Sequence, residues 1–338
     1  MIGLVSYLVF FFTITTILAI AVLGLNLQWG HTGIFNGGVV AFFGTGAYAV
    51  ILLGGPERAG EFGGFDLIWP LAMLGGMIAA GLLALIVGLA TTRLRHDYLA
   101  IATFGVAIAV ETVARNAEYW TGGAKGLRGF QRPLEAAIGD PFLYNLGFLS
   151  VVILCLVLVF IALERLVRSP FGRLLRAVRE DETAARALGK SPSRVRLQSF
   201  VIGAVIMGLS GGLYATFYAY IGPQDLAPIL TFQIWAMLIV GGAGNNRGAV
   251  LGTLVVWGGW VGSGWALTAF APQSMQLYAG TLQYILIGLI IVGTLMLRPR
   301  GLLPEILTVS ARAAQGATPS ESRPAMRTGQ TTKGEKVT

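Results

Sequence analysis

Long apolar stretches separated by short polar ones recur along most of the chain. A helix that crosses a bilayer needs about 17 to 25 mostly apolar residues, and nine stretches reach or approach that length. The fourth and the seventh are short for a full crossing. Because such runs predict transmembrane helices, we expect an all-α polytopic membrane protein with about nine transmembrane helices, in the range of eight to ten. The nine stretches are 5–27, 34–53, 67–92, 98–114, 146–163, 199–218, 229–242, 249–267 and 277–297.

The composition agrees with this pattern. Hydrophobic residues make up 55% of the 338 residues and charged residues only 12%, whereas soluble domains are about 25% charged. Such a chain cannot cover a water-facing surface, which excludes a soluble globular enzyme. The 47 glycines suit close helix packing and broken helices in a membrane protein. One cysteine and two histidines exclude a disulfide framework and a Cys/His zinc site.

The basic residues orient the chain. The 24 Lys and Arg outnumber the 16 Asp and Glu, and the net charge is +8. If the nine stretches alternate in direction, nineteen of the 24 fall on one set of loops, which the positive-inside rule places in the cytoplasm. We therefore expect the N-terminus outside, the C-terminus inside and no nucleic-acid partner. Met1–Tyr7 has no basic residue, so we interpret the first stretch as a retained helix rather than a signal peptide.

Two Gly-rich polar stretches interrupt the apolar pattern, 26–38 and 241–248. Irregular backbone at membrane depth is tolerated only where protein buries it or where it lines a water-filled cavity. Gly-interrupted segments in two halves of a transporter point to a translocation site between inverted repeats, so we predict an inverted repeat. The alternative is that both stretches are tight cytoplasmic turns.

The hydrophilic segment 164–198 has the pattern of ordered structure. Ser169-Pro170 predicts a helix N-cap with Pro at the first helical position, and Gly189 suits the position after a helix end. We expect one helix over 172–188 and a second short helix starting at Ser191-Pro192. A short helix held between two spans suits docking into a groove of a partner. The alternative is a helix lying on anionic lipid, with its arginines at the headgroups.

The sequence motifs for nucleotide binding and catalysis are incomplete in this chain. Gly189-Lys190-Ser191 resembles the end of a phosphate-binding loop, but position 184 is Ala where that motif requires Gly. The Gly44-Thr-Gly46 run lies inside an apolar stretch and indicates helix packing. No nucleophile with a base and no carboxylate cluster has catalytic spacing, so we expect that the chain is not an enzyme and has no nucleotide site.

Ionisable residues near membrane spans are functional candidates. Glu111 and Arg115 have the spacing of a helical ion pair, which is the interpretation that we favour for them. His31 and His96 flank predicted cytoplasmic boundaries. A role in proton coupling is the functional alternative for these histidines, and an interfacial position is the simpler one.

Several runs of residues together resemble the LivM-type permease of branched-chain amino-acid ABC importers. The resemblance covers about Val22 to Pro304, and the tail beyond it has the composition of a disordered segment. The runs that carry it are Leu23–Gly33, Ala41–Tyr48, Asp97–Thr103, Ser169–Glu180, Ala184–Gly189, Phe200 with Gly208–Ala215, and Gly241–Gly244.

The resemblance implies an ABC importer permease fold and a heteromeric transporter of the bacterial inner membrane. The expected partners are a second, LivH-like permease, two ABC ATPase subunits, an external solute-binding protein and membrane lipid. The chain is expected to bind no cofactor itself, since ATP and Mg²⁺ belong to the ATPases. We divide it into a permease domain, 1–307, which contains the cytoplasmic coupling segment 164–198, and a disordered cytoplasmic tail, 308–338.

The resemblance also implies residue roles. The family's cytoplasmic coupling motif corresponds to Arg176, Arg179, Glu180, Ala184, Ala185 and Gly189. For the translocation path we select polar residues of the two interruptions, namely Asn26, His31, Asn36, Asn245 and Asn246.

The expected function is the translocation of branched-chain amino acids or a related small solute by alternating access. Urea and short amides are alternatives in the same family, because the chain departs from the family pattern at His31 and at 36–38. A self-contained secondary transporter or channel is a further alternative, which the scarcity of charge within the spans disfavours. The sequence does not identify the solute.

Overall fold

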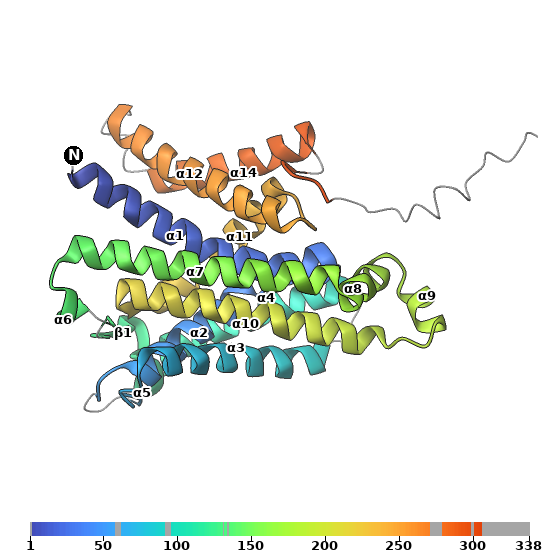
Figure 1. Ribbon diagram of the computed structural model, residues 1–338, viewed down its shortest axis with the longest axis horizontal. Helices are drawn as coiled ribbons and strands as arrows, with labels where there is room; N and C mark the ends of the chain where they lie inside the picture. The colour runs from blue at the N-terminus through green and yellow to red at the C-terminus, as the bar shows by residue number, and fades with distance from the viewer. Residues whose placement is uncertain are drawn as a thin grey trace, which may run out of the picture. The chain divides into compact units, whose positions relative to one another are not determined.

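The computed structural model describes residues 2–57, 62–91, 96–130, 132–133, 135–270, 279–298 and 301–305. These residues form an α-helical bundle, in which each of the nine predicted stretches contains a helix (Figure 1). Six of the helices are long and apolar enough to span a membrane, and three apolar helices are shorter. The nine are α1 (Ile2–Asn26), α2 (Val39–Gly54), α3 (Trp69–Thr91), α4 (His96–Asn116), α7 (Pro141–Arg168), α10 (Pro192–Tyr218), α11 (Pro228–Gly241), α12 (Asn246–Phe270) and α14 (Ala279–Leu297).

The outer helices present apolar side chains to their surroundings. Ile86 on α3 is 67% exposed, Ile101 on α4 is 71% exposed and Leu154 on α7 is 58% exposed. Soluble monomers rarely expose apolar patches beyond a few hundred Å², whereas lipid tails solvate such side chains well. The structure therefore supports the prediction of an all-α polytopic membrane protein.

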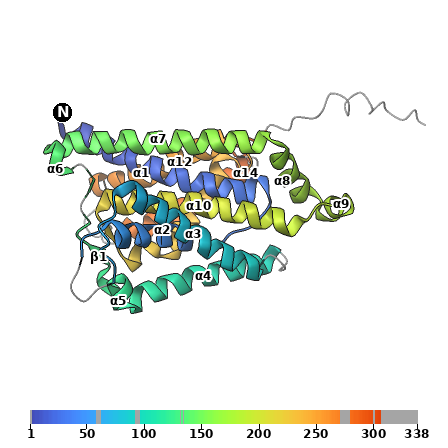
Figure 2. The same ribbon diagram turned by 60° about the horizontal axis from the view of Figure 1, so that its bottom comes forward.

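The connections gather at two ends of the bundle (Figures 1 and 2). The α8–α9 end holds α8 (Pro170–Glu180) and α9 (Glu182–Ala187). The opposite end holds the start of α1 and a set of short elements, in which Leu127 pairs with Ile221 in an antiparallel two-residue ladder. The short elements are α5 (Glu118–Thr121), η2 (Gly123–Lys125), β1 (Leu127–Arg128), α6 (Glu135–Ile138), β2 (Tyr220–Ile221) and η3 (Pro223–Leu226).

Helix α2 lies at the centre of the bundle, against α10 and α3. Most of its residues are buried, including Phe42 and Phe43. Glycines permit this packing: a Cβ at Gly46 would collide with the backbone of Gly208, and a Cβ at Gly76 would lie 2.8 Å from the Gly46 carbonyl oxygen. The Gly44-Thr-Gly46 run is thus a helix-packing feature, as predicted.

Two short helices follow irregular segments. Helix α1 ends in a turn of π-helix, η1 (Leu27–His31), and α2 begins only at Val39 rather than at Ile34 as predicted. With a rise of about 1.5 Å per residue, the 16 residues of α2 and the 14 of α11 are shorter than the hydrocarbon layer of about 30 Å.

Our pairing of the two polar interruptions requires a correction. The first, 26–38, precedes α2, whereas 241–248 follows α11, and a hydrogen bond between Asn26 and Asn246 joins them at one end of the bundle. Corresponding parts of an inverted repeat lie at opposite membrane faces. In an inverted repeat, the counterpart of the segment before α2 would be the segment before α11, residues 219–227. The order of a long, a short and a long helix recurs in α1–α2–α3 and α10–α11–α12, and the inverted repeat itself stays a prediction.

The packing at Gly46 gives a first prediction. Replacing Gly46 with Ala forces α2 away from α10, and overpacking of this kind costs about 1–3 kcal/mol. We expect a lower melting temperature of the purified protein in detergent. Gly105→Ala on α4 is the matched control, because nothing lies within 4 Å of its added Cβ. Equal melting temperatures for the two variants would contradict the close approach of α2 and α10.

Candidate functional site

The predicted coupling segment forms two short helices that leave and re-enter the bundle at one end (Figure 2). Ser169 caps α8, since its Oγ accepts a hydrogen bond from the Gly172 amide at 3.4 Å. Gly189 has φ +73°, the left-handed conformation expected after a helix end. Both caps agree with the sequence prediction.

The single helix predicted over 172–188 is wrong. The chain breaks at Asp181, whose φ is −149° and whose carboxylate accepts from the Thr183 and Ala184 amides at 2.8 and 2.9 Å. Asp181 is thus an N-cap that starts a new helix, α9. The short helix expected at Ser191-Pro192 is also wrong, because Pro192 begins the 27-residue helix α10.

The proposed coupling residues divide into an outer set and an inner set, which is Arg176, Arg179 and Ala185 and is buried or half-buried. The outer set, Glu180, Ala184 and Gly189, is exposed. The side chain of Ala185, a member of the predicted coupling motif, is buried and packs within the chain rather than at the exposed face. Leu188, which follows α9, is 80% exposed, so the tip of this segment carries an apolar group that no other described residue covers.

Arg179 connects the coupling segment to the interruption between α1 and α2. One guanidinium nitrogen donates to the carbonyl oxygen of Gly30, in the π-helical turn η1. The other donates to a carboxylate oxygen of Glu305 at 2.9 Å. Gly33, with φ +74°, leaves room for this side chain, since a Cβ there would lie 3.0 Å from Arg179 Cγ. The planar guanidinium fork suits two acceptors held at once.

A second set of contacts joins α1 to α12 and α7. The Asn26 amide nitrogen donates to Asn246 at 2.9 Å, and its oxygen accepts from the Gly244 amide at 2.8 Å. The Asn246 amide nitrogen donates to Glu164 at 3.0 Å. Asn26 is fully buried. Gly30 has no room for a side chain, because a Cβ there would collide with Asn26 and the Gly244 amide.

A third set of contacts holds the irregular backbone before α2. Gln28 donates to the Phe200 carbonyl oxygen on α10 and accepts from Asn36, both at 2.8 Å. The Asn36 carbonyl oxygen accepts from the Trp235 indole at 2.8 Å, and this indole stacks on Phe35 with ring centroids 4.3 Å apart. These contacts pair the polar groups of Gln28 and Asn36 within the protein, as groups buried away from water require.

The five proposed path residues therefore have different surroundings. Asn26 and Asn246 bond directly to each other, and Asn36 lies in the adjacent network with Gln28. Asn245 caps α12, where its oxygen accepts from the Arg247 amide at 3.0 Å. His31 is buried, and neither ring nitrogen has a hydrogen-bond partner within the described structure. In this conformation the four asparagines bond to other parts of the protein, and their role in translocation stays a prediction.

Sequence reasoning missed several members of this cluster, which we call the junction cluster. Gln28 lay inside the polar stretch that we had singled out, but Glu305 follows the last span with no local signal. The junction cluster consists of Asn26, Gln28, Gly30, Asn36, Glu164, Arg179, Gly244, Asn246 and Glu305.

Elsewhere, the structure tests the other ionisable candidates. Arg115 and Glu111 form the predicted ion pair at 2.8 Å at the C-terminal end of α4. This end of α4 leads into α5, opposite α8 and α9 (Figure 2). His96 begins α4, and its side chain lies outside the described structure. Within the residues that the structure describes, no group of three His, Cys, Asp or Glu side chains could hold a metal ion.

Comparison with known proteins adds to this geometry. Residues 7–295 match the family described as the permease component of branched-chain amino acid transport systems. The LivM permease protein of a high-affinity branched-chain amino acid transport system from Salmonella typhimurium is 30% identical, with 86% of this chain and 69% of that protein aligned.

Two archaeal relatives extend the comparison. A probable LivM permease of Methanocaldococcus jannaschii is 29% identical, with 90% of this chain and 94% of that protein aligned. A probable LivH permease of the same organism is 29% identical over 32% of this chain and 35% of its own length. No solved structure matches the chain significantly.

A match over most of the chain, with apolar helices that expose their side chains as lipid requires, identifies a multi-pass membrane transport protein rather than an enzyme. The chain belongs to the family of branched-chain amino acid transport permeases, and it is a permease subunit of a multi-subunit ABC importer.

Proposed function

We propose that this permease forms half of a path for branched-chain amino acids or a closely related small solute. The LivM names of its relatives support this substrate class. Urea and short amides are the alternative within the family, because the departures at His31 and 36–38 lie at the junction cluster. Uptake of radiolabelled leucine and of urea by the reconstituted transporter, each with and without the other as competitor, distinguishes the two.

The observation that carries the proposed mechanism is the double contact of Arg179. The exposed outer face of α8 and α9 docks into an ABC ATPase subunit, with Glu180, Ala184, Gly189 and Leu188 at the contact. Arg179 holds the inner face to Gly30 and Glu305. A displacement of the docked helices by ATP binding therefore pulls on the turn between α1 and α2, and through Asn26 and Asn246 on α12 and α7.

The proposed assembly contains a second, LivH-like permease, two ATPase subunits that bind ATP and Mg²⁺, and an external solute-binding protein. The α8–α9 end faces the cytoplasm in this proposal, because the nine basic residues of 165–196 belong to it. The N-terminus is then outside, the C-terminus is inside, and the tail 308–338 is cytoplasmic. The bacterial inner membrane is the proposed location.

A self-contained secondary transporter is the rival. Its test is transport by the purified chain alone in liposomes. Solute uptake that follows an ion gradient and is indifferent to ATP would reject the proposed dependence on ATPases, whereas uptake only with the ATPases and ATP present supports it.

Removal of the Arg179 contact gives a second prediction. In the assembled transporter, Arg179→Ala is expected to lower the solute transported per ATP hydrolysed about tenfold, since hydrogen bonds to charged groups contribute about 1.5–3 kcal/mol. For Arg179→Lys we expect a ratio of solute transported to ATP hydrolysed between those of the wild type and Arg179→Ala. Lysine keeps the positive charge but lacks the planar guanidinium that binds two acceptors. The measurement pairs solute uptake with ATP hydrolysis in proteoliposomes.

The control for this experiment is Arg115→Ala, which removes an exposed helical ion pair at the opposite end. A double-mutant cycle with Glu305→Ala tests the specific contact. Independent, additive effects of Arg179→Ala and Glu305→Ala would contradict the role of this pair in coupling.

The exposed face of the coupling segment gives a third prediction. Glu180→Lys and Leu188→Asp, each at an exposed position, are expected to reduce co-purification of the ATPase subunits and to uncouple ATP hydrolysis from transport. Glu111→Lys at the other end is the charge-matched control. Unchanged assembly and coupling in both coupling-segment variants would refute the docking assignment.

A further inference from the structure

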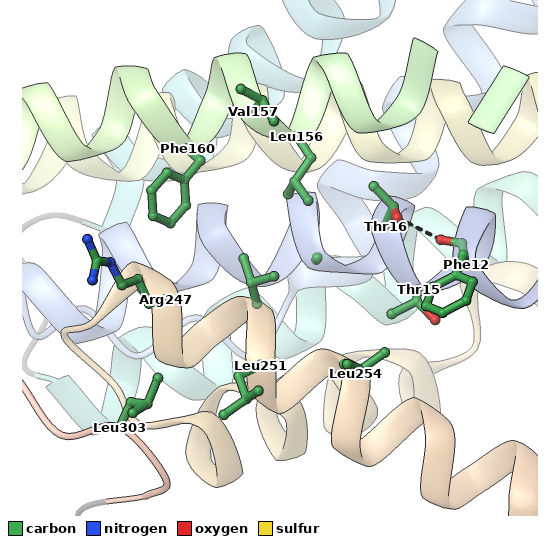
Figure 3. Close-up of a pocket in the computed structure, with 12 residues that line it drawn as sticks. Phe12, Thr15, Thr16, Leu156, Val157, Phe160, Arg247, Leu251, Leu254 and Leu303 are labelled. Carbon is green, nitrogen blue, oxygen red and sulfur yellow. Dashed lines mark hydrogen bonds between the residues drawn. The ribbon is translucent and has the colours of Figure 1, made fainter. Parts of the chain in front are cut away.

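A long apolar groove runs between α1, α7 and α12 (Figure 3). Its volume is about 510 Å³, within the range of about 300–1,000 Å³ that is usual for ligand sites. The residues that line it are Phe12, Thr15, Thr16 and Ala19 of α1, Leu156, Val157 and Phe160 of α7, Arg247, Val250, Leu251 and Leu254 of α12, and Leu303.

The interior of the groove offers no polar recognition. The two hydroxyl groups in its wall are already bonded, since Thr15 donates to the Phe11 carbonyl oxygen at 2.7 Å and Thr16 to that of Phe12 at 2.6 Å. The remaining lining side chains, apart from Arg247, are hydrocarbon. The groove therefore suits a flexible hydrocarbon chain and not an amino acid or another polar solute.

Arg247 is the exception, and it stands at the end of the groove next to Phe160 and Leu303 (Figure 3). Its side chain is exposed, and among the described residues its guanidinium makes no ion pair or hydrogen bond. The nearby carboxylate of Glu164 is engaged by Arg168 at 2.6 Å and by Asn246 at 3.0 Å.

The position of Arg247 is also unfavourable for the stability of its own helix. It follows Asn246 in the first turn of α12, where the helix dipole favours anions and repels cations. The charge of Arg247 attracts that of Glu164 without a direct ion pair, and the helix dipole does not favour an arginine here. In the orientation of the proposed function, on which this inference rests, Arg247 lies at the cytoplasmic membrane boundary. A cation there, beside an apolar groove, matches a phospholipid with its anionic headgroup and its acyl chain.

We propose that the groove binds an anionic phospholipid from the leaflet at the α8–α9 end, with one acyl chain between α1, α7 and α12 and the phosphate on Arg247. An acyl chain gains little by exchanging bulk lipid for the groove, because both are hydrocarbon. Selectivity must therefore come from the headgroup and its charge. The site adjoins the junction cluster, since Arg247 directly follows Asn246, which bonds to Asn26 and Glu164.

The test is photo-crosslinking of the full chain in phosphatidylcholine vesicles. Two probes carry the same diazirine-bearing acyl chain, one on phosphatidylglycerol and the other on phosphatidylcholine, and mass spectrometry locates the labelled peptides. We expect phosphatidylglycerol to label the groove segments, 12–19, 156–160 and 250–254, more than phosphatidylcholine does. An arginine near the surface is worth about a fivefold preference for anionic lipid, which Arg247→Gln removes and added salt weakens.

Matched variants separate the groove from general membrane contact. Val157→Trp fills the groove and is expected to abolish labelling there, whereas Leu158→Trp, on the same helix but not in the lining, leaves it unchanged. Arg194→Gln, another exposed arginine of the α8–α9 end, controls for net charge. Equal labelling by the two lipids, or labelling that Arg247→Gln leaves unchanged, would overturn the proposal.

The same experiment on the assembled transporter tests the other possible occupant. Retained labelling supports a lipid site in the working complex. Loss of labelling, together with cross-links from groove residues to the sibling permease, would overturn the proposal in favour of a protein interface.

Discussion

The structure depends on one constraint: backbone that leaves the helical conformation at membrane depth must find its hydrogen-bond partners within the protein. Between α1 and α2 the chain is irregular, and three other parts of the fold supply hydrogen-bond partners for it. The Gly30 carbonyl oxygen accepts from Arg179, and the Asn36 carbonyl oxygen accepts from Trp235. Gln28 reaches the Phe200 carbonyl oxygen on α10. The interruption therefore ties α8, α10 and α11 to α1 and α2, and none of them can move without affecting it.

The coupling segment, α8 and α9, has an inner face that packs against the bundle and an outer face that is exposed. The inner face buries Leu175, Val178 and Ala185 and carries Arg179 into the junction cluster. The outer face keeps Glu180 and Leu188 exposed. In the proposed function, an inner attachment and an exposed outer surface suit a segment that links an ATPase subunit to the membrane helices. Arg179, unlike the exposed Arg173, Arg186 and Arg194, points into the protein and is not placed to contact a lipid headgroup.

The bundle around this junction is held by packing rather than by expulsion of apolar surface from water. Lipid tails solvate an exposed isoleucine as well as a helix interior does, so close contact must supply the stability. The approach of α2 to α10 at Gly46 and Gly208 provides that contact. Where packing is incomplete, as between α1, α7 and α12, the space is apolar and open to the hydrocarbon that surrounds the protein.

The sequence by itself determined the features that depend on neighbouring residues. Runs of apolar residues predicted the positions of the nine helices, and local chemistry predicted the Ser169 cap, the Gly189 turn and the Glu111–Arg115 pair. The tertiary structure decided which helix faces meet. The Asn26–Asn246 hydrogen bond joins residues 220 positions apart in the sequence, and the Arg179–Glu305 ion pair joins residues 126 positions apart. It also decided that Asp181 breaks the predicted helix and that Ala185 faces inward. Hydrophobic periodicity and caps are properties of a short segment, whereas these contacts arise only when distant helices pack side by side, and no local pattern records which helices those are.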